Sequence, residues 1–141
     1  MQLDERQARE RFSASRVASL AMADLEARPF VVVVTFAVVG STVVTAVDRK
    51  PKTTRDLHRL RLIQANPRVS LLAHHYDDSD WTSLWWVRAD GVARVIEDPD
   101  ECAGPVRQLA AKYRQYVSEP PDGPVIEISV RRWLGWAYSA V

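Results

Sequence analysis

Cations cluster where a predicted helix begins. Lys50, Lys52 and Arg55 stand between an apolar run and a helical pattern that ends at Asn66-Pro67. A helix N-terminus already carries positive partial charge, so cations are mildly unfavourable there unless an anion binds. Lysines on a short loop, a hydroxyl such as that of Thr53 and free backbone N–H groups are the parts that hold a phosphate. The cluster therefore predicts a phosphate site, although charge alone is also compatible with a solvated basic loop.

Other chemistries fit the sequence poorly. His74 and His75 point to opposite faces of a predicted strand, with no Cys or carboxylate partner at a ligand spacing, so we expect no metal site. Cys102 has no basic neighbour in sequence that would activate its thiol. Walker, Rossmann and nucleophile-elbow motifs are absent. The sequence therefore nominates no catalytic side chain.

Composition limits the class of protein. A chain of 141 residues with 47% hydrophobic residues predicts a single domain over 1–141. The net charge of +1 gives no reason to expect a nucleic-acid partner. No stretch has the apolar core of a signal peptide or the roughly 18 to 20 apolar residues of a membrane helix. We therefore expect a cytoplasmic protein without a membrane partner.

Strands dominate the first half of the chain in our prediction. We expect a helix over 3–12, a strand over 17–23 and a strand over 30–39, whose β-branched and aromatic residues indicate burial on both faces. After a turn at Gly40-Ser41, the run 42–47 completes a three-stranded meander. A helix capped by Thr53 or Thr54 follows, with leucines at helical spacing.

The second half continues in the same manner. We expect a strand over 69–76, two strands within 81–98 that are joined or bent near Asp90-Gly91, a helix over 100–117 with Pro105 in its first turn, and a final strand over 125–138. Most strands are adjacent in sequence, which favours antiparallel pairing. The prediction is a mainly β (α+β) antiparallel barrel of six or seven strands with two or three peripheral helices.

The tryptophans need a separate explanation. Trp85 and Trp86 lie on opposite faces of one predicted strand, so neither face is suited to water. One interpretation places the barrel interior on one side and a helix or a second subunit on the other. The alternative is that an indole forms the wall of a slot for a flat ring. Trp136, near the C-terminus, could pack at a strand end or cover the same slot.

Four segments together resemble a known family. They are VTFAV at 34–38, TAVDRKPKTTR at 45–55, NPRVSLL at 66–72 and WWVRADGVARV at 85–95. Their order resembles that of the pyridoxamine 5'-phosphate oxidase-like split β-barrel flavoproteins, which bind FMN or F420. The resemblance is closer to the branch of small actinobacterial enzymes that use the deazaflavin coenzyme F420.

The resemblance implies a coenzyme site. In this family the coenzyme lies in a groove between the two subunits of a homodimer, and its phosphate is held where a strand leads into a helix. Lys50, Lys52 and Thr53 would hold that phosphate. The full set of residues expected to contact the coenzyme is Thr35, Phe36, Thr45, Ala46, Lys50, Lys52, Thr53, Arg55, Trp85, Trp86 and Trp136. Val33 fills a position where such proteins usually carry proline, which leaves the orientation of the ring near it open.

Charge favours F420 over FMN. F420 has a phosphodiester and an oligoglutamyl tail, and Arg55 and Arg59 extend the cations beyond a single phosphate. The implied function is an oxidoreductase that transfers a hydride between the reduced coenzyme and an unsaturated small-molecule substrate. The coenzyme would carry the chemistry, which agrees with the lack of a catalytic motif. The alternatives are an FMN-dependent oxidoreductase, a non-enzymatic carrier of flavin, F420 or haem, and a purely structural dimerisation barrel.

Overall fold

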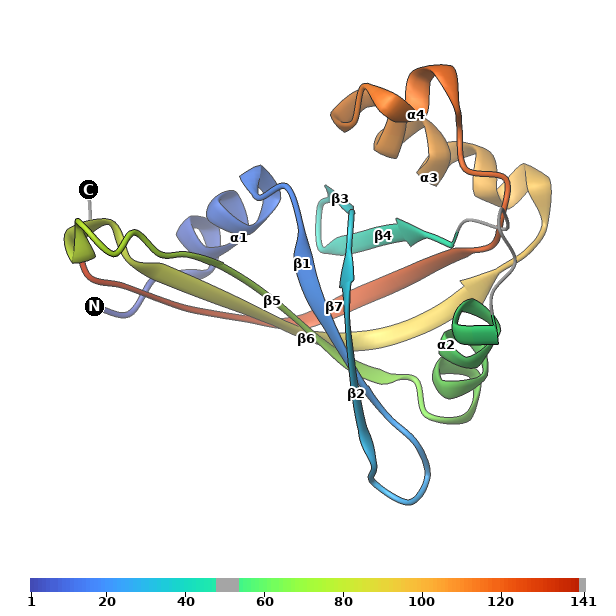
Figure 1. The fold of residues 1–141 in the computed structure, drawn as a ribbon, viewed down its shortest axis with the longest axis horizontal. Coiled ribbons are helices and arrows are strands. Elements are labelled where there is room, and N and C mark those ends of the chain that lie inside the picture. The colour runs from blue at the N-terminus through green and yellow to red at the C-terminus, as the bar shows by residue number, and fades with distance from the viewer. Residues whose placement is uncertain (48–53, 140–141) are drawn as a thin grey trace.

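Seven antiparallel strands form one curled sheet in the computed structural model of the protein (Figure 1). The structure describes residues 1–47 and 54–139, and of residues 54–57 it describes the backbone alone. The strands are β1 (Ala18–Ala23), β2 (Pro29–Val34), β3 (Ala37–Val39), β4 (Thr42–Ala46), β5 (Arg68–His75), β6 (Trp85–Ile96) and β7 (Val125–Ala137). Their order in the sheet is β2-β1-β5-β6-β7-β4-β3. The predicted antiparallel split-barrel class is confirmed.

The two edges of the sheet belong to one continuous segment of chain. Only Thr35 and Phe36 separate β2 from β3, although these strands stand at opposite ends of the strand order. These two residues therefore connect the two edges of the curled sheet, which closes it into a barrel. The predicted single strand over 30–39 is wrong, because the chain forms two strands there. β2 pairs with β1, whereas β3 pairs with β4 at the opposite edge of the sheet, so the three runs do not form the predicted meander of neighbouring strands. Burial on both faces is also wrong, since Val31 and Val33 are 65% and 67% exposed.

Helices cover the open parts of the barrel. They are α1 (Glu5–Ala14), α2 (Thr54–Ala65), α3 (Pro99–Lys112) and α4 (Gln115–Ser118). In the capping box of α1, an Asp4 carboxylate oxygen accepts from the Gln7 backbone N–H at 2.8 Å, and the Gln7 side chain accepts from the Asp4 N–H at 3.0 Å. On α2, Leu60 and Ile63 are buried, which confirms the predicted apolar stripe.

The predicted helix over 100–117 is broken at Tyr113. The Tyr113 hydroxyl donates to the Arg16 carbonyl at 2.6 Å and accepts from the Phe36 backbone N–H at 3.1 Å. These long-range contacts accompany an extended Tyr113 backbone, which ends α3 before α4 begins. The predicted place of Pro105 is wrong, because it lies inside α3 and Pro99 occupies the first turn.

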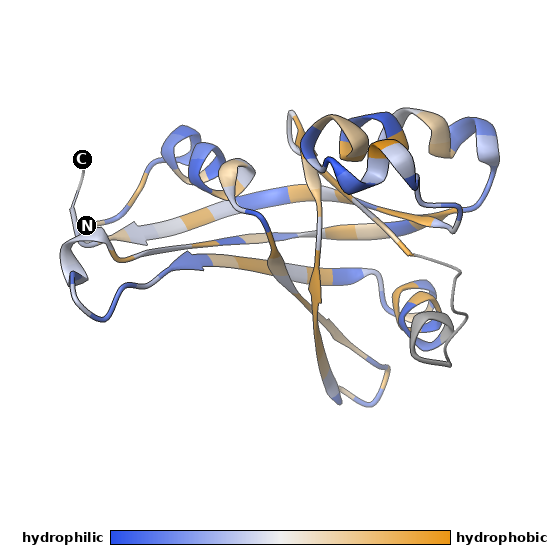
Figure 2. Ribbon diagram, turned by 45° about the horizontal axis from the view of Figure 1, so that its top comes forward, coloured by the Kyte–Doolittle hydropathy of each residue, from blue (hydrophilic) through white to orange (hydrophobic). Residues whose placement is uncertain are grey.

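Aromatic rings fill the middle of the barrel. Phe12 of α1 lies 4.7 Å from Phe36 and 5.4 Å from Trp133, measured between ring centroids. Phe12 and Phe36 are fully buried, so α1 seals one opening of the sheet. A second apolar cluster joins α3 to the sheet around Leu109 and Val125. Figure 2 shows the hydrophobic residues along the strands and on parts of the helices.

A bulge bends the longest strand pair. Asp90 lies opposite Arg132 but Gly91 lies opposite Val130, which leaves Arg131 without a cross-strand partner. The two strands expected within 81–98 are thus one strand, β6, bent at the expected place. Trp81 lies outside it in a short 3-10 turn, η1 (Trp81–Ser83).

Candidate functional site

A groove of about 650 Å³ runs between β2 and α2. Residues 30–33 line it on the β2 side, and His58, Arg59 and Leu62 line it on the α2 side. The Phe30 ring meets the His58 ring edge to face, with centroids 5.0 Å apart. The complete lining is Met22, Phe30, Val31, Val32, Val33, His58, Arg59 and Leu62. An apolar wall facing a few polar groups suits a flat ring with a polar substituent.

The predicted phosphate site adjoins this groove in sequence. Lys50, Lys52 and Thr53 lie outside the described residues. Arg55 belongs to the first turn of α2, which begins at Thr54, and its side chain is not described. Arg59, one turn further along α2, lines the groove. The start of α2 and the groove therefore belong to one region of the protein.

The four residues expected to border the coenzyme ring lie together near the β3–β4 hairpin. Thr35 and Phe36 directly precede β3, while Thr45 and Ala46 end β4. The Phe36 ring is fully buried in the core, so only its backbone could face a ligand. Thr45 is also buried, whereas Thr35 is half-buried.

The indoles lie at the other end of the barrel. Trp85 packs against the core with the Arg11 guanidinium 5.9 Å from its ring. Trp86 is the cross-strand partner of Trp136, which lies eleven residues beyond Val125 along β7, roughly 35 Å at the usual strand rise. Ala46 pairs with Val125, so Trp86 and Trp136 lie far from Thr45 and Ala46 within one chain.

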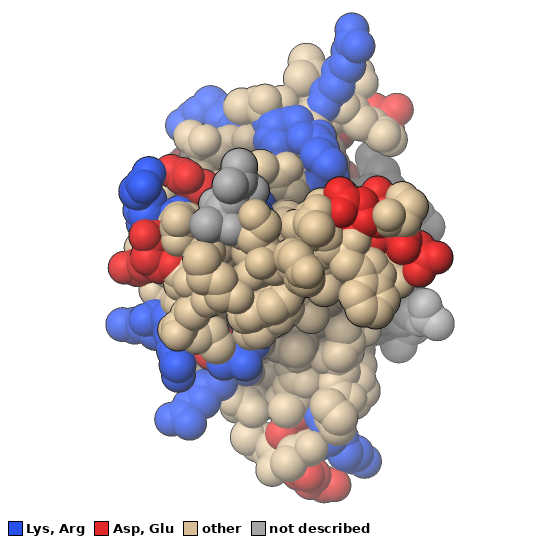
Figure 3. All heavy atoms as spheres, turned by 90° about the vertical axis from the view of Figure 1, so that its left-hand side faces the viewer, with Lys and Arg blue, Asp and Glu red and all other residues tan. Residues whose placement is uncertain are grey.

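The end of the molecule that carries the indoles is poor in charge. Figure 3 shows a broad surface there without Lys, Arg, Asp or Glu, with charged side chains around it. Tyr76, Trp81 and Tyr138 are exposed, and the Tyr138 N–H donates to the Leu84 carbonyl, which joins the end of β7 to the η1 segment. Exposed apolar surface of this kind marks contact sites for other molecules.

A basic cluster next to Thr35 and Phe36 was not predicted from the sequence. We define the basic cluster as Arg16, Lys112, Tyr113 and Tyr116. The Lys112 Nζ atom lies 3.7 Å from the centroid of the Phe36 ring and 5.3 Å from that of Tyr113, and it finds no hydrogen-bond acceptor among the described residues. The Arg16 guanidinium lies 4.6 Å from the Tyr113 ring and donates to the Lys112 carbonyl at 3.1 Å.

Hydroxyl groups complete the basic cluster. The hydroxyls of Tyr116 and Thr35 share a hydrogen bond of 2.8 Å, which ties α4 to the segment between β2 and β3. Residues 16, 35 and 112–116 are far apart in the chain. Only the tertiary fold brings them together, so no local pattern could predict the cluster.

Burial and the nearby charge of Arg16 lower the pKa of Lys112 from 10.5 to about 8. Between these values the unfolded chain binds more protons than the folded chain, so the contribution of Lys112 to the unfolding free energy rises with pH. We expect Lys112→Met to stabilise the protein at pH 7, on the order of 1 kcal/mol after allowance for partial exposure and cation–π attraction. Chemical denaturation at several pH values measures the difference in unfolding free energy between Lys112→Met and the wild type. This difference should shrink between pH 8 and 10, and a difference that stays constant with pH would contradict the prediction.

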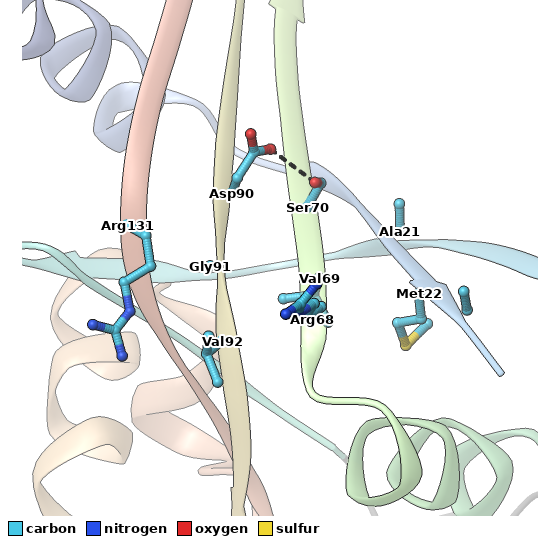
Figure 4. Close-up of a pocket in the computed structure, with 10 residues that line it drawn as sticks. Ala21, Met22, Arg68, Val69, Ser70, Asp90, Gly91, Val92 and Arg131 are labelled. Carbon is cyan, nitrogen blue, oxygen red and sulfur yellow. Dashed lines mark hydrogen bonds between the residues drawn. The ribbon is translucent and has the colours of Figure 1, made fainter. Parts of the chain in front are cut away.

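A second hollow of about 490 Å³ lies at the bulge in the sheet (Figure 4). Asp90 accepts there from the Ser70 hydroxyl at 2.8 Å and from two nitrogens of Arg88 at 2.8 and 3.0 Å. Burial raises the pKa of Asp90, but these hydrogen bonds outweigh burial and the pKa falls below its usual value. Arg88 thus already satisfies the carboxylate, and the remaining cations, Arg68 and Arg131, are exposed. The groove beside β2 is the better candidate.

Comparison with known proteins identifies the family. The model of the family described as pyridoxamine 5'-phosphate oxidase matches residues 4–137, nearly the whole chain. The chain belongs to the pyridoxamine 5'-phosphate oxidase family. The resemblance seen in the sequence is thereby confirmed at the level of this flavin-binding split-barrel family. No curated protein sequence matches the chain.

Solved structures with the same fold are distant in sequence. A conserved hypothetical protein of Mycobacterium tuberculosis has a TM-score of 0.75 at 19% identity, covering 96% of this chain and 86% of its own. An FAD-binding protein of Mesorhizobium loti has a TM-score of 0.75 at 18% identity, with 96% and 95% covered. The haem storage protein HutZ of Vibrio cholerae has a TM-score of 0.69 at 18% identity, with 94% and 93% covered. At such identities the likeness shows the fold alone.

Two absences hold for the part of the chain that the structure describes. Within residues 1–47 and 54–139, no group of three or more His, Cys, Asp or Glu side chains is placed to hold a metal ion. No helix in these ranges is both long and apolar enough to cross a membrane.

Proposed function

We propose that this member of the pyridoxamine 5'-phosphate oxidase family is an F420-dependent oxidoreductase that reduces an unsaturated small molecule. The observation that carries the proposal is the groove between β2 and α2, which is lined by apolar residues of β2 and by His58 and Arg59 of α2. Its volume of about 650 Å³ is in the range of small-molecule sites. The bound coenzyme supplies the hydride transfer, and the protein binds and orients the reactants.

The residues of the groove fit a deazaflavin. The apolar residues of β2 that line the groove border the ring, while Lys50, Lys52 and Thr53 hold the phosphate at the start of α2. Arg55 and Arg59 follow on the same helix and attract the carboxylates of the oligoglutamyl tail. FMN ends in a single phosphate and needs fewer cations. The number of cations is therefore the reason to prefer F420.

The proposal requires two subunits. Trp85, Trp86 and Trp136 lie at one end of the barrel, and Thr45 and Ala46 lie near the other. Both groups can contact one coenzyme only if a second copy of the chain supplies the indoles. The exposed valines of the edge strand β2 give such a copy apolar surface to bury, and the uncharged surface in Figure 3 could be covered without burying Lys, Arg, Asp or Glu side chains.

We therefore expect a homodimer in solution. Light scattering at micromolar concentration should give about twice the subunit mass of 16.0 kDa. Val33→Lys places a charge on the exposed wall of the β2 edge and should shift the equilibrium toward monomer without unfolding the protein, because Val33 is 67% exposed. A wild-type mass near 16.0 kDa would contradict the two-subunit site.

Turnover tests the enzymatic part of the proposal. Reduced F420 is mixed with the protein and a panel of enones, quinones and biliverdin-like tetrapyrroles, and coenzyme oxidation is followed by absorbance. We expect protein-dependent oxidation with at least one member of the panel. The second candidate is a carrier, which the fold of the haem storage protein HutZ supports. Tight coenzyme or haem binding without oxidation in any assay would favour the carrier.

A further inference from the structure

We propose that Lys112 and Arg16 bind an oxyanion, a carboxylate or a phosphate group, of the molecule that reacts at the coenzyme ring. This inference rests on the proposed function, because Thr35 and Phe36, which would border the ring, also contact the basic cluster. It names the chemical class of the substrate, an anionic unsaturated compound. It also assigns a role to residues that the coenzyme site does not use.

The charges of the basic cluster are not balanced. Lys112 and Arg16 are close enough for the Arg16 charge to act on the Lys112 ammonium group, and no carboxylate of the described residues pairs with either side chain. Aromatic faces provide part of the stabilisation of the ammonium group, since Phe36 and Tyr113 lie beneath it. A buried ammonium group still lacks the hydrogen-bond acceptors that it has in water. An anion would supply them.

The hydrogen bonds of the cluster also leave donors in excess. Lys112 has three N–H donors, and its Nζ atom has no acceptor among the residues described. Tyr116 and Thr35 have two hydroxyl hydrogens but use one in their mutual bond. Tyr113 is fully engaged, because its hydroxyl both donates to Arg16 and accepts from Phe36. The Lys112 ammonium group and the unused hydroxyl hydrogen are donors, which matches a ligand group that accepts hydrogen bonds.

The geometry explains how a covered amine can reach a ligand. The Nζ atom is shielded, but Lys112 as a whole is half-buried and Arg16 is exposed beside it. A lysine stem has four rotatable carbons, so the ammonium group can leave the Phe36 ring for an arriving anion. The ammonium group then lies over the aromatic rings when no anion is bound.

Three related probes test the proposal on the whole chain. The protein has three lysines, so carbon-13 labelling at lysine Cε gives few signals, and Lys112→Met assigns the one from Lys112. The probes are cinnamate, phenyl phosphate and uncharged cinnamamide. We expect at least one anion to shift the Lys112 signal in a saturable manner and to raise the pKa of Lys112 above about 8. Cinnamamide should not do so, and the tighter of the two anions identifies the preferred group.

The variants separate a specific site from general attraction. Lys112→Met keeps most of the stem and should weaken binding of the preferred anion about tenfold to hundredfold. The matched control Arg107→Met removes an exposed cation from the same helix and should leave this affinity unchanged. No shift with either anion, an equal shift with cinnamamide, or an unchanged affinity in Lys112→Met would overturn the proposal. Coenzyme titrations on the same variants are independent, so a failed coenzyme site would not be mistaken for a failed anion site.

Discussion

Replacing Lys52 by alanine is expected to weaken F420 binding about tenfold to hundredfold. The proposed contact joins the lysine ammonium group to the phosphate at the start of α2, and a charge-assisted hydrogen bond contributes roughly 1.5 to 3 kcal/mol. Folding should hardly change, because one cation near the positive end of a helix dipole contributes little stability. Fluorescence titration gives the affinity, and circular dichroism confirms that the variant is folded.

Arg61→Ala is the matched control for this prediction. Arg61 is an exposed cation on α2 but does not line the groove. Its removal changes the net charge by the same amount, so it measures the general electrostatic contribution. If Lys52→Ala and Arg61→Ala reduce the affinity equally, the cations act only through their summed charge. Unchanged affinity in folded Lys52→Ala would mean that the phosphate site is elsewhere.

The largest expected effect on stability is that of Gly91→Ala. A Cβ atom at position 91 would overlap the Ser129 carbonyl oxygen, at a separation much shorter than real Cβ contacts. The strands of the bulge must separate to admit the methyl group, and we expect a loss of about 2 to 4 kcal/mol in the free energy of unfolding. Thermal unfolding should shift down by roughly 5 to 15 °C.

Gly104→Ala is the control for the glycine substitution. Gly104 lies inside α3, and the nearest atom to a Cβ there is a guanidinium nitrogen of Arg107 at 3.8 Å, an ordinary contact. Alanine is the better helix former, so this variant should gain about 0.5 to 1 kcal/mol. Equal stability of Gly91→Ala and the wild type would show that β6 and β7 do not approach each other so closely at the bulge.

The sequence predicts the class and most elements of the fold, because hydrophobic period and turn residues are local signals. The bend at Gly91 was expected from the Asp90-Gly91 pair, and the structure confirms it. The split of the run 30–39 was not expected. A series of β-branched residues looks alike whether it forms one strand or two, and only the pairing of β2 with β1 and of β3 with β4 decides. The same holds for the break at Tyr113, which depends on contacts with Arg16 and Phe36.

The candidate site is less accessible to sequence reasoning. Cations at the start of α2 stand close together in the chain, so the sequence alone reveals their pattern. His58 and Val31 form the groove only because α2 packs beside β2. The indoles were expected to join the ring-bordering residues, but the length of β7 separates them within one chain. Their contribution stays a prediction that depends on the second subunit.

The central claim is that the groove beside β2 binds F420 through the cations at the start of α2. Its most direct test is titration of the purified protein with F420 and with FMN at the same ionic strength, followed by fluorescence. We predict saturable binding of one coenzyme per subunit, with tighter binding of F420 because its tail adds carboxylates for Arg55 and Arg59. Equal or tighter binding of FMN, or no saturation with either coenzyme, would contradict the account.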